Sequence, residues 1–320
     1  MIGPTIIDDP RFDARFDAEA LKKAMQGIGT DEKTILRVLT KRSNRQRQLI
    51  SQKYKELFNK VLANELQREL GGKFEKVILA LMTPAYEYDA HKLHQAMKGL
   101  GTNEDVLIEI LVSRSQEQLR KIMETYRNMY KKDLVSDIKG DTSGSFEKLM
   151  VYLCKANRKS DYGSYDKGKV NADAQALINA GIKNAMGTDT SVFCEILVNR
   201  SLSHVRAVFE EYQHISKHCI EDDIKREMKG DSENAFISLV ECIRYPASYF
   251  AKKIHLAMKQ GMGTDDDTLV RLLVTRAEID LGDIRQDFQR IYNKSLEASI
   301  KDECSGDYED ALVSLVVGNR

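Results

Sequence analysis

The sequence predicts an all-α protein made of four repeats of about 70 residues. Three observations carry this prediction. Four prolines and 19 glycines in 320 residues favour long helices over many strands and turns. Apolar residues recur at the spacing i, i+3, i+4, which is one face of a helix. A Gly-Thr pair occurs four times, with the same residue types at fixed distances after it.

The repeat is defined by several positions that agree in all four copies. The Gly-Thr pairs begin at Gly29, Gly101, Gly187 and Gly263. Each pair is followed by Asp or Asn, then by Leu ten residues after the glycine and by Arg thirteen residues after it. An acidic residue lies forty residues after each glycine, at Glu69, Asp141, Glu227 and Glu303. Because several distances agree four times, we interpret them as a true repeat.

The spacing of the repeats divides the chain into six segments. The middle gap is the longest and contains a polar stretch with two glycines and two tyrosines, which is typical of a linker. The predicted segments are a head (1–12), repeat I (13–84), repeat II (85–156), a linker (157–171), repeat III (172–244) and repeat IV (245–320).

Around the first Gly-Thr pair the sequence predicts a helix, a tight loop and a second helix. Residues 18–25 form an amphipathic segment, and Gly27 follows where a left-handed helix cap is common. Thr30 or Asp31 is suited to cap the next helix. The arginine at the thirteenth position continues the apolar stripe, so we expect a buried, hydrogen-bonded guanidinium with a structural role.

Composition and charge exclude several classes of protein. Lys and Arg total 49, as do Asp and Glu, so a nucleic-acid binder held by bulk positive charge is not expected. No apolar stretch is long enough to span a bilayer, and the N-terminus lacks the apolar core of a signal peptide. Five cysteines without paired spacing indicate reduced thiols. We therefore expect a cytoplasmic protein, with any extracellular presence reached by an unconventional route.

The loops have the chemistry of a cation site. The last carbonyls of a helix lack intrahelical partners and carry the negative end of the helix dipole, and glycines leave them accessible. If the acidic residue forty positions later joins such a loop, about five oxygens face one point. Calcium prefers six to eight, which leaves room for water or a partner's oxygen. In a single repeat, the simpler interpretation would be helix caps and exposed acids; four equal spacings favour the cation site.

These motifs resemble the annexin family over nearly the whole chain, from about Phe12 to Leu315. The resemblance rests on the segments 25–32 (MQGIGTDE), 97–104 (MKGLGTNE), 261–266 (GMGTDD), 140–144 (GDTSG) and 305–308 (SGDY). It implies four repeats of five helices, packed as a slightly curved disc. It also implies calcium loops on the convex face, where the phosphates of an anionic membrane complete the coordination.

Carried over to this sequence, the resemblance implies three main calcium sites. The first would use carbonyls of Met25, Gly27 and Gly29 with the carboxylate of Glu69. The second would use Met97, Gly99 and Gly101 with Asp141. The fourth-repeat site would use Lys259, Gly261 and Gly263 with Glu303. Doubtful or weaker sites involve Thr30 and Glu32 in the first repeat, and Lys183, Gly187 and Glu227 in the third.

The chain also departs from the family pattern. The third loop is interpreted as one residue longer than usual, and Thr190 stands where an acid is common. The fourth loop has an insertion at Gln260. The family's charge pairs map to Asp89 with Arg114 and to Glu109 with Arg271, and we expect structural roles for these four residues.

The predicted function is calcium-dependent, reversible binding to anionic phospholipid such as phosphatidylserine, on membranes when calcium rises. The resemblance also allows self-association on membranes. The alternative is a calcium-independent α-helical solenoid that binds proteins. An enzyme is not expected, because the six histidines lie in no nucleophile or metal motif. An EF-hand is excluded, because its loop pattern is absent from the sequence.

Overall fold

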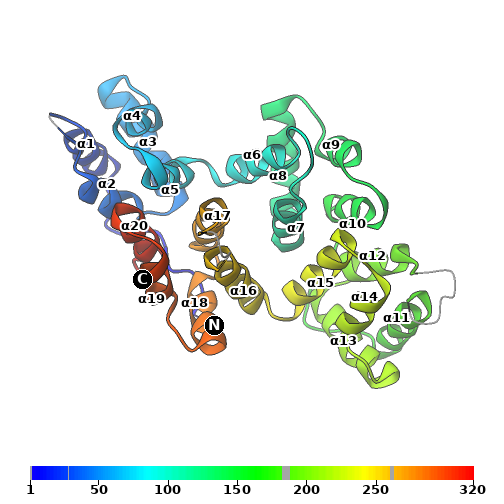
Figure 1. Ribbon diagram of the computed structural model, residues 1–320. Coiled ribbons are helices and arrows are strands. Elements are labelled where there is room, and N and C mark those ends of the chain that lie inside the picture. Colours follow the sequence, from blue (N-terminus) through cyan, green and yellow to red (C-terminus); the bar gives the residue numbers. More distant parts are fainter. Residues whose placement is uncertain (1, 28, 182–187, 260–262) are drawn as a thin grey trace. The chain divides into compact units, whose positions relative to one another are not determined.

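The computed structural model describes residues 2–27, 29–181, 188–259 and 263–320. Within these ranges the chain forms twenty α-helices and no β-strand (Figure 1). The predicted all-α class is confirmed. None of the helices in these ranges is both long and apolar enough to cross a membrane.

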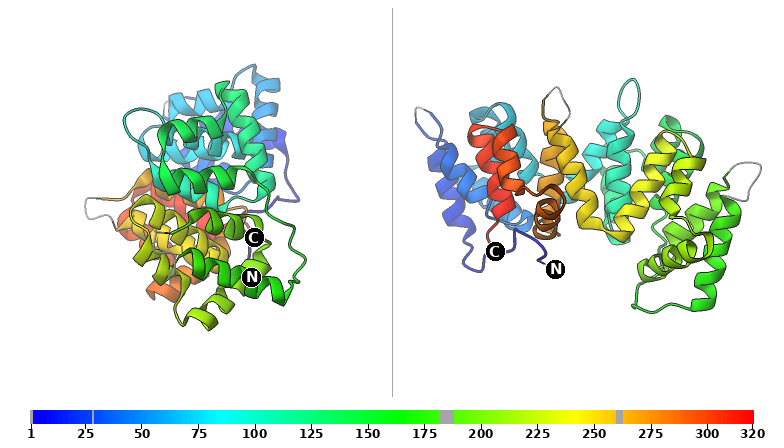
Figure 2. Two further views of the ribbon diagram at one scale, coloured as in Figure 1. Left: turned by 90° about the vertical axis from the view of Figure 1, so that its right-hand side faces the viewer. Right: turned by 60° about the horizontal axis from the view of Figure 1, so that its bottom comes forward.

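The helices fall into two compact units. Unit 1 comprises residues 1–85 and 247–320, and unit 2 comprises residues 86–246. The first repeat therefore packs with the fourth, and the second packs with the third. Along the chain, in contrast, the linker separates the first two repeats from the last two. The linker runs inside unit 2, and unit 1 is built from both ends of the chain (Figure 2).

Unit 1 holds the helices of the first and fourth repeats. Those of the first are α1 (Ala14–Ala24), α2 (Glu32–Leu39), α3 (Asn44–Phe58), α4 (Leu62–Glu69) and α5 (Gly72–Met82). Those of the fourth are α16 (Pro246–Met258), α17 (Asp266–Arg276), α18 (Leu281–Tyr292), α19 (Leu296–Glu303) and α20 (Gly306–Val317). The core of this unit lies where α5, α17 and α20 pack together, with Ile78, Leu273 and Leu312 inaccessible to solvent.

Unit 2 repeats this arrangement with the second and third repeats. Its helices from the second repeat are α6 (Ala85–Ala96), α7 (Glu104–Ser113), α8 (Gln116–Tyr130), α9 (Leu134–Asp141) and α10 (Gly144–Cys154). Those from the third are α11 (Lys167–Ala180), α12 (Thr190–Asn199), α13 (Leu202–Ser216), α14 (Ile220–Glu227) and α15 (Asp231–Arg244). Here α10 packs on α7, α12 and α15 around one continuous apolar core that includes Leu107, Leu149 and Phe236.

Local sequence signals explain where the helices begin and end. The side chains of Asp31, Asn103, Asp189 and Asp265 accept a hydrogen bond from a backbone N–H in the first turn of α2, α7, α12 and α17. Of the two predicted caps in the first repeat, the structure selects Asp31. The third helix of every repeat ends on a left-handed residue, and these residues are Asn59, Lys131, Lys217 and Asn293.

The arginine at the thirteenth position binds a carboxylate in every repeat. Arg42, Arg114 and Arg200 donate to Asp17, Asp89 and Asp173, each on the first helix of the same repeat. In the fourth repeat this first-helix position is occupied by Phe250, whose ring centroid lies 4.2 Å from the Arg276 guanidinium, and Arg276 binds Asp280 instead. In the first three repeats, these pairs tie the first helix to the end of the second.

The N-terminal head lies along the fourth repeat within unit 1. Thr5 is buried, its N–H donates to Ala277 (2.9 Å), and its hydroxyl donates to the carbonyl of Leu315 (2.7 Å). The N–H of Asn319 donates to the carbonyl of Thr5. Gly318 has φ +74°, and a Cβ there would lie 2.0 Å from the Thr5 carbonyl oxygen, so this close approach requires glycine.

The pair Asp89–Arg114 gives a prediction about stability. Arg114 donates to both carboxylate oxygens of Asp89, at 2.7 and 2.9 Å, and the side chains of Arg114 and Asp89 are only 2% and 7% exposed. Asp89→Asn removes the charge that accepts two hydrogen bonds from the buried guanidinium, so the free energy of unfolding should fall by about 3–5 kcal/mol, measured by urea denaturation. Glu19→Gln, which breaks the exposed pair with Arg15, is the control and should change it little. Equal losses of unfolding free energy in the two variants would show that burial does not determine how much an ion pair contributes to stability.

Candidate metal sites in the interhelical loops

Each repeat has two loops that are built alike. The first joins helices one and two and contains the Gly-Thr pair. The second joins helices four and five and follows the acidic residue. The four acids, Glu69, Asp141, Glu227 and Glu303, are each the last residue of their helix, namely α4, α9, α14 and α19. All four are exposed.

A backbone hydrogen bond closes the first loop of every repeat. The N–H of the Asp or Asn cap donates to the carbonyl of an alanine at or next to the end of the preceding helix, over 2.7–2.9 Å. The donor–acceptor pairs are Asp31–Ala24, Asn103–Ala96, Asp189–Ala180 and Asp265–Ala257. The first two loops have equal length, the fourth has one more residue, and the third has two more. The prediction of one extra residue in the third loop was therefore wrong by one.

Glycines provide the backbone conformation that these loops need. Gly27 and Gly29 have φ values of +102° and +87°, and Gly99 and Gly101 have +111° and +87°. Gly263 has +113°. L-residues with a side chain rarely adopt such angles. A Cβ at any of the five would meet no atom within 4 Å, so the requirement is conformational, and the loops are open to solvent.

The carbonyls in the first two loops are uncommitted. In the part of the chain that the structure describes, no hydrogen bond is accepted by the carbonyl of any of these six residues: Met25, Gly27, Gly29, Met97, Gly99 and Gly101. Because backbone carbonyls normally find a partner, such runs of free oxygens beside a helix end are suited to hold a cation.

In the first and second repeats, a threonine brings the two loops together. The hydroxyl of Thr30 donates to the Glu69 carboxylate (3.1 Å), and the hydroxyl of Thr102 donates to the backbone carbonyl of Asp141 (3.1 Å). The acid predicted forty residues downstream thus lies next to the Gly-Thr loop. These two contacts agree with the prediction that the helices between the two loops bring the loops close together.

The electrostatics of the acids favour a bound cation. A carboxylate on the last residue of a helix faces the negative end of the helix dipole, which disfavours its charge. The described chain contains no group of three or more His, Cys, Asp or Glu side chains placed to hold a metal ion. Several neutral carbonyls with one carboxylate form an oxygen-only donor set, which fits calcium and does not fit zinc.

The third repeat has a different charge arrangement. Glu227 accepts a hydrogen bond from Arg226 at 3.0 Å, and Arg226 also binds Asp223. The hydroxyl of Thr188 is buried and has no hydrogen-bond partner among the described residues. The other two predicted ligands, Lys183 and Gly187, lie outside the described residues. The carboxylate of this repeat thus already has a cationic partner, which it shares with Asp223.

The fourth repeat is described only in part. Gly261 lies outside the described residues. Measured from the closing hydrogen bond on Ala257, the residue equivalent to Met25 and Met97 is Met258 rather than Lys259. Glu303 ends α19 and is exposed.

Two ion pairs bring the loops of unit 1 to the same end of that unit. Lys73, in the first turn of α5, pairs with Asp266 at the start of α17 (2.8 Å). Lys76 pairs with Asp267 (3.1 Å). In unit 2 the corresponding helix starts meet through Lys148 and Ser191, at 3.1 Å. Each unit therefore gathers the loops of its two repeats on one surface.

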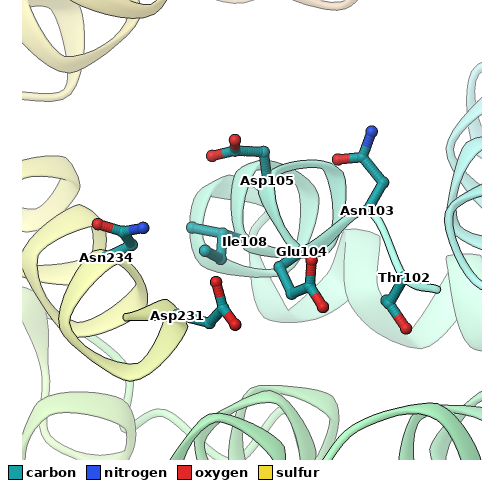
Figure 3. Close-up of a pocket in the computed structure, with 7 residues that line it drawn as sticks. All are labelled: Thr102, Asn103, Glu104, Asp105, Ile108, Asp231 and Asn234. Carbon is teal, nitrogen blue, oxygen red and sulfur yellow. The ribbon is translucent and has the colours of Figure 1, made fainter. Parts of the chain in front are cut away.

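The second repeat has a pocket at the positions that correspond to Thr30 and Glu32, where a weaker site is predicted in the first repeat. Thr102 and Glu104 line a shallow pocket of about 220 Å³ between the start of α7 and the start of α15 (Figure 3). Asp231 and Asn234 of α15 line its other wall. The sequence could not identify this wall, because it depends on the packing of the second repeat against the third.

The second predicted charge pair is divided between the units. Glu109 is buried on α7 in unit 2, and Arg271 is buried on α17 in unit 1. Arg271 donates to the hydroxyl of Thr268 one turn earlier on α17.

Burial shifts the pKa values of two groups near the loops. Burial, with smaller contributions from Glu65 and Glu69, raises the pKa of Tyr54 to about 12. Burial also raises the pKa of Cys304, which follows Glu303, to about 11. Both groups are therefore neutral at physiological pH, and the Cys304 thiol is a poor metal ligand there. All five cysteines are free thiols.

Comparison with known proteins gives a consistent family assignment. The Annexin family model matches residues 16–81, 88–153, 172–239 and 249–315. The chain is 49% identical to annexin A5 of Cynops pyrrhogaster over 311 residues, which cover 97% of this chain and 95% of the relative. It is 49% identical to annexin A8 of Mus musculus over 314 residues, covering 98% and 95%.

Solved structures lead to the same family. The fold is similar to that of annexin III, with a TM-score of 0.95, 43% identity, and coverage of 99% of this chain and 98% of that one. It is also similar to a calcium-bound annexin (Sm)1 structure, with a TM-score of 0.89, 32% identity and coverage of 98% and 93%. The predicted resemblance is confirmed: this chain belongs to the annexin family of calcium-dependent phospholipid-binding proteins.

Proposed function

We propose that this protein binds anionic phospholipid membranes reversibly, through calcium held in its interhelical loops. The observation that carries the proposal is the pairing of free loop carbonyls with an acid at a helix end, as at Met25, Gly27 and Gly29 with Glu69. Family membership supports it independently.

The residues of the first two repeats are the main proposed ligands. In each, three loop carbonyls are free and the acid supplies a negative charge, which makes about five oxygens. When bound, calcium supplies positive charge and open coordination positions that accept water or a lipid phosphate oxygen. In the fourth repeat we propose Gly261, Gly263 and Glu303 with the carbonyl of Met258 or Lys259. We propose that the third repeat contributes least.

Several weak sites can together give firm binding. Each unit gathers two loops on one surface, so a second contact with the same membrane benefits from a high effective concentration. The net charge near zero offers little attraction to an anionic bilayer without the cation. We therefore propose release when calcium is removed, a cytoplasmic protein that becomes peripheral on membranes as calcium rises, and a binding protein rather than an enzyme.

The central test neutralises the three main acids. Glu69→Gln/Asp141→Asn/Glu303→Gln should abolish co-sedimentation with phosphatidylserine vesicles in calcium, while the wild type pellets in calcium and not in chelator. The matched control, Glu19→Gln/Glu56→Gln/Glu117→Gln, changes the net charge equally at exposed ion pairs away from the loops along the chain. If both variants pellet with the vesicles in calcium, the assignment of these three acids as calcium ligands is refuted. If the wild type does not pellet with the vesicles in calcium, the calcium-independent protein-binding scaffold is favoured.

A second test uses thermal stability and the two ends of α9. Asp141→Asn removes a carboxylate from the C-terminal end, so in chelator Tm should rise by about 1 °C. Asp133→Asn, at the N-terminal cap of the same helix, should lower it. Calcium should raise the Tm of the wild type more than that of Asp141→Asn. A lower Tm for Asp141→Asn in chelator would contradict the dipole argument.

A third test addresses the third repeat. Arg226→Gln removes the cation that pairs with Glu227, so the calcium concentration for half-maximal vesicle binding should fall about twofold to fivefold. Arg68→Gln is the matched control: Arg68 also directly precedes the acid of its repeat, but it pairs with Glu65 and not with Glu69. Adding Glu227→Gln to Arg226→Gln should reverse the gain. If Arg226→Gln and Arg68→Gln lower the calcium requirement equally, the change in net charge explains the effect and the pair with Glu227 does not.

A further inference from the structure

The fourth repeat lacks a side chain that the other three repeats share. Six residues after the arginine that binds a carboxylate, the first three repeats carry a long polar side chain on the third helix. This side chain donates to a backbone carbonyl at or near the end of the fifth helix. The donors and acceptors are Gln48 with Met82 (2.8 Å), Arg120 with Ala156 (2.7 Å) and Arg206 with Ile243 (2.9 Å). The fourth repeat has Gly282 at this position.

The N-terminal head lies in the space beside Gly282. The N–H of Gly282 donates to the carbonyl of Gly3 (2.9 Å), and Asp283 accepts from the N–H groups of Ile2 (2.6 Å) and Gly3 (3.1 Å). A Cβ on Gly282 would lie 2.7 Å from the Gly3 carbonyl oxygen and 2.8 Å from Cγ2 of Ile2. The head therefore takes part of the space that a side chain at this position would fill.

A pocket of about 530 Å³ remains between the head, α18, α19 and the end of the chain. Its volume is in the range of small-molecule sites. All the residues that line it belong to unit 1. Its lining combines apolar side chains with charges of both signs, and the residues that matter here are Ile2, Pro4, Val317, Arg285, Glu297 and Arg320.

One carboxylate oxygen of this lining is unsatisfied. Glu297 pairs through Oε1 with Arg285, and its side chain is only 16% exposed. Its Oε2 is buried and has no hydrogen-bond partner among the described residues. Buried polar atoms of native proteins nearly always have a partner, so we expect a donor from outside the chain at this oxygen.

The third repeat shows how the same position is satisfied without a ligand. Glu221 is the second residue of α14, as Glu297 is of α19. Arg244 lies 2.9 Å from Oε1 of Glu221 and donates to its Oε2 at 3.4 Å. One arginine thus reaches both oxygens in the third repeat, whereas the fourth repeat leaves one oxygen for another donor.

The charges of the pocket restrict the ligand. The side chain of Arg285 is 47% exposed, and Arg320 adds a second guanidinium, which donates to the carbonyl of Ile2. A purely cationic ligand would be repelled by these two groups, and a purely anionic ligand would leave Oε2 of Glu297 without a donor. A molecule with both an ammonium and a carboxylate satisfies the carboxylate and the guanidinium groups together.

The pocket lies at the end of unit 1 away from the Gly-Thr loops. Helix α17 begins beside the loop of Gly263 and runs away from it, and α18 begins near its far end, at Leu281. The head and the last residues of the chain lie side by side at this end of the unit, where the N–H of Asn319 donates to Thr5 (Figure 2). Binding in the pocket should therefore require neither calcium nor a membrane.

We propose that this pocket binds a small aliphatic zwitterion of the α-amino acid type. Its ammonium donates to Oε2 of Glu297, its carboxylate accepts from Arg285, and its aliphatic side chain contacts Pro4 and Val317. The site is independent of the calcium sites. A lipid headgroup such as phosphoserine also carries an ammonium and a carboxylate, but its phosphate replaces the aliphatic part, so it should bind more weakly.

The test uses L-leucine and three related probes, with affinities measured by saturation-transfer NMR on the full chain in chelator. N-acetyl-L-leucine lacks the ammonium and L-leucinamide lacks the carboxylate, so each should bind at least about fivefold more weakly than L-leucine. O-phospho-L-serine should also bind more weakly. Calcium should leave the affinity for L-leucine unchanged.

Two outcomes with these probes overturn the proposal. If L-leucine gives no saturation transfer at 10 mM, water alone satisfies Glu297 and the pocket is not a zwitterion site. If N-acetyl-L-leucine binds as tightly as L-leucine, the ammonium does not meet Glu297. Tighter binding of O-phospho-L-serine than of L-leucine would assign the pocket to a headgroup and refute the aliphatic ligand.

A matched pair of variants tests the role of Glu297. Glu297→Gln keeps the shape of the side chain and removes its charge, so L-leucine should bind about tenfold more weakly, while N-acetyl-L-leucine should change little. Glu221→Gln is the control, because it alters the equivalent Glu–Arg pair of the third repeat. Equal weakening of L-leucine binding in the two variants would contradict the assignment.

A further variant tests the apolar wall without depending on the ion pair. Val317 is 52% exposed, so Val317→Ser should fold normally. It should reduce the preference for L-leucine over glycine, because the side chain of leucine loses its apolar contact. An unchanged preference would show that the aliphatic group lies elsewhere and would overturn this part of the proposal.

Discussion

The structure depends on one backbone constraint that is repeated four times. In each repeat an Asp or Asn cap donates its N–H to the carbonyl of an alanine near the end of the preceding helix, and this bond closes a short loop. Where the intervening turns are described, glycines take left-handed angles that other residues avoid, and in the first two loops the glycine carbonyls stay unpaired. The same closure thus joins two helices and supplies the oxygens of a candidate cation site.

The acids at the helix ends show a conflict between stability and function. Four helices end on a carboxylate, where the helix dipole disfavours negative charge. Elsewhere the chain follows the dipole, with Asp caps at the beginnings of α2, α12 and α17. A cation bound at the loops would remove the unfavourable interaction. The third repeat removes it differently, because Arg226 already binds Glu227.

Much of the site could be predicted from the sequence, because its parts are local or strictly periodic. The Gly-Thr loops, the capping residues and the acids forty positions later each follow from residue type and spacing, and they lie where expected in the first two repeats. The length of the third loop could not be read correctly, because sequence spacing does not show which carbonyl closes a loop. For the same reason, the sequence indicated Lys259 as the residue equivalent to Met25 in the fourth repeat, whereas the closing hydrogen bond on Ala257 indicates Met258.

By itself, the sequence determined the helices, their caps and the loops, because these depend on neighbouring residues and on the conformational freedom of glycine. Only the tertiary structure decided which repeats pair, since that depends on packing between segments far apart in the chain, such as the head at Thr5 with Leu315. It also decided the partner of Arg276, which binds Asp280 because Phe250 occupies the place of the usual aspartate. A buried guanidinium must find a carboxylate nearby, and which carboxylate is near is a property of the folded chain.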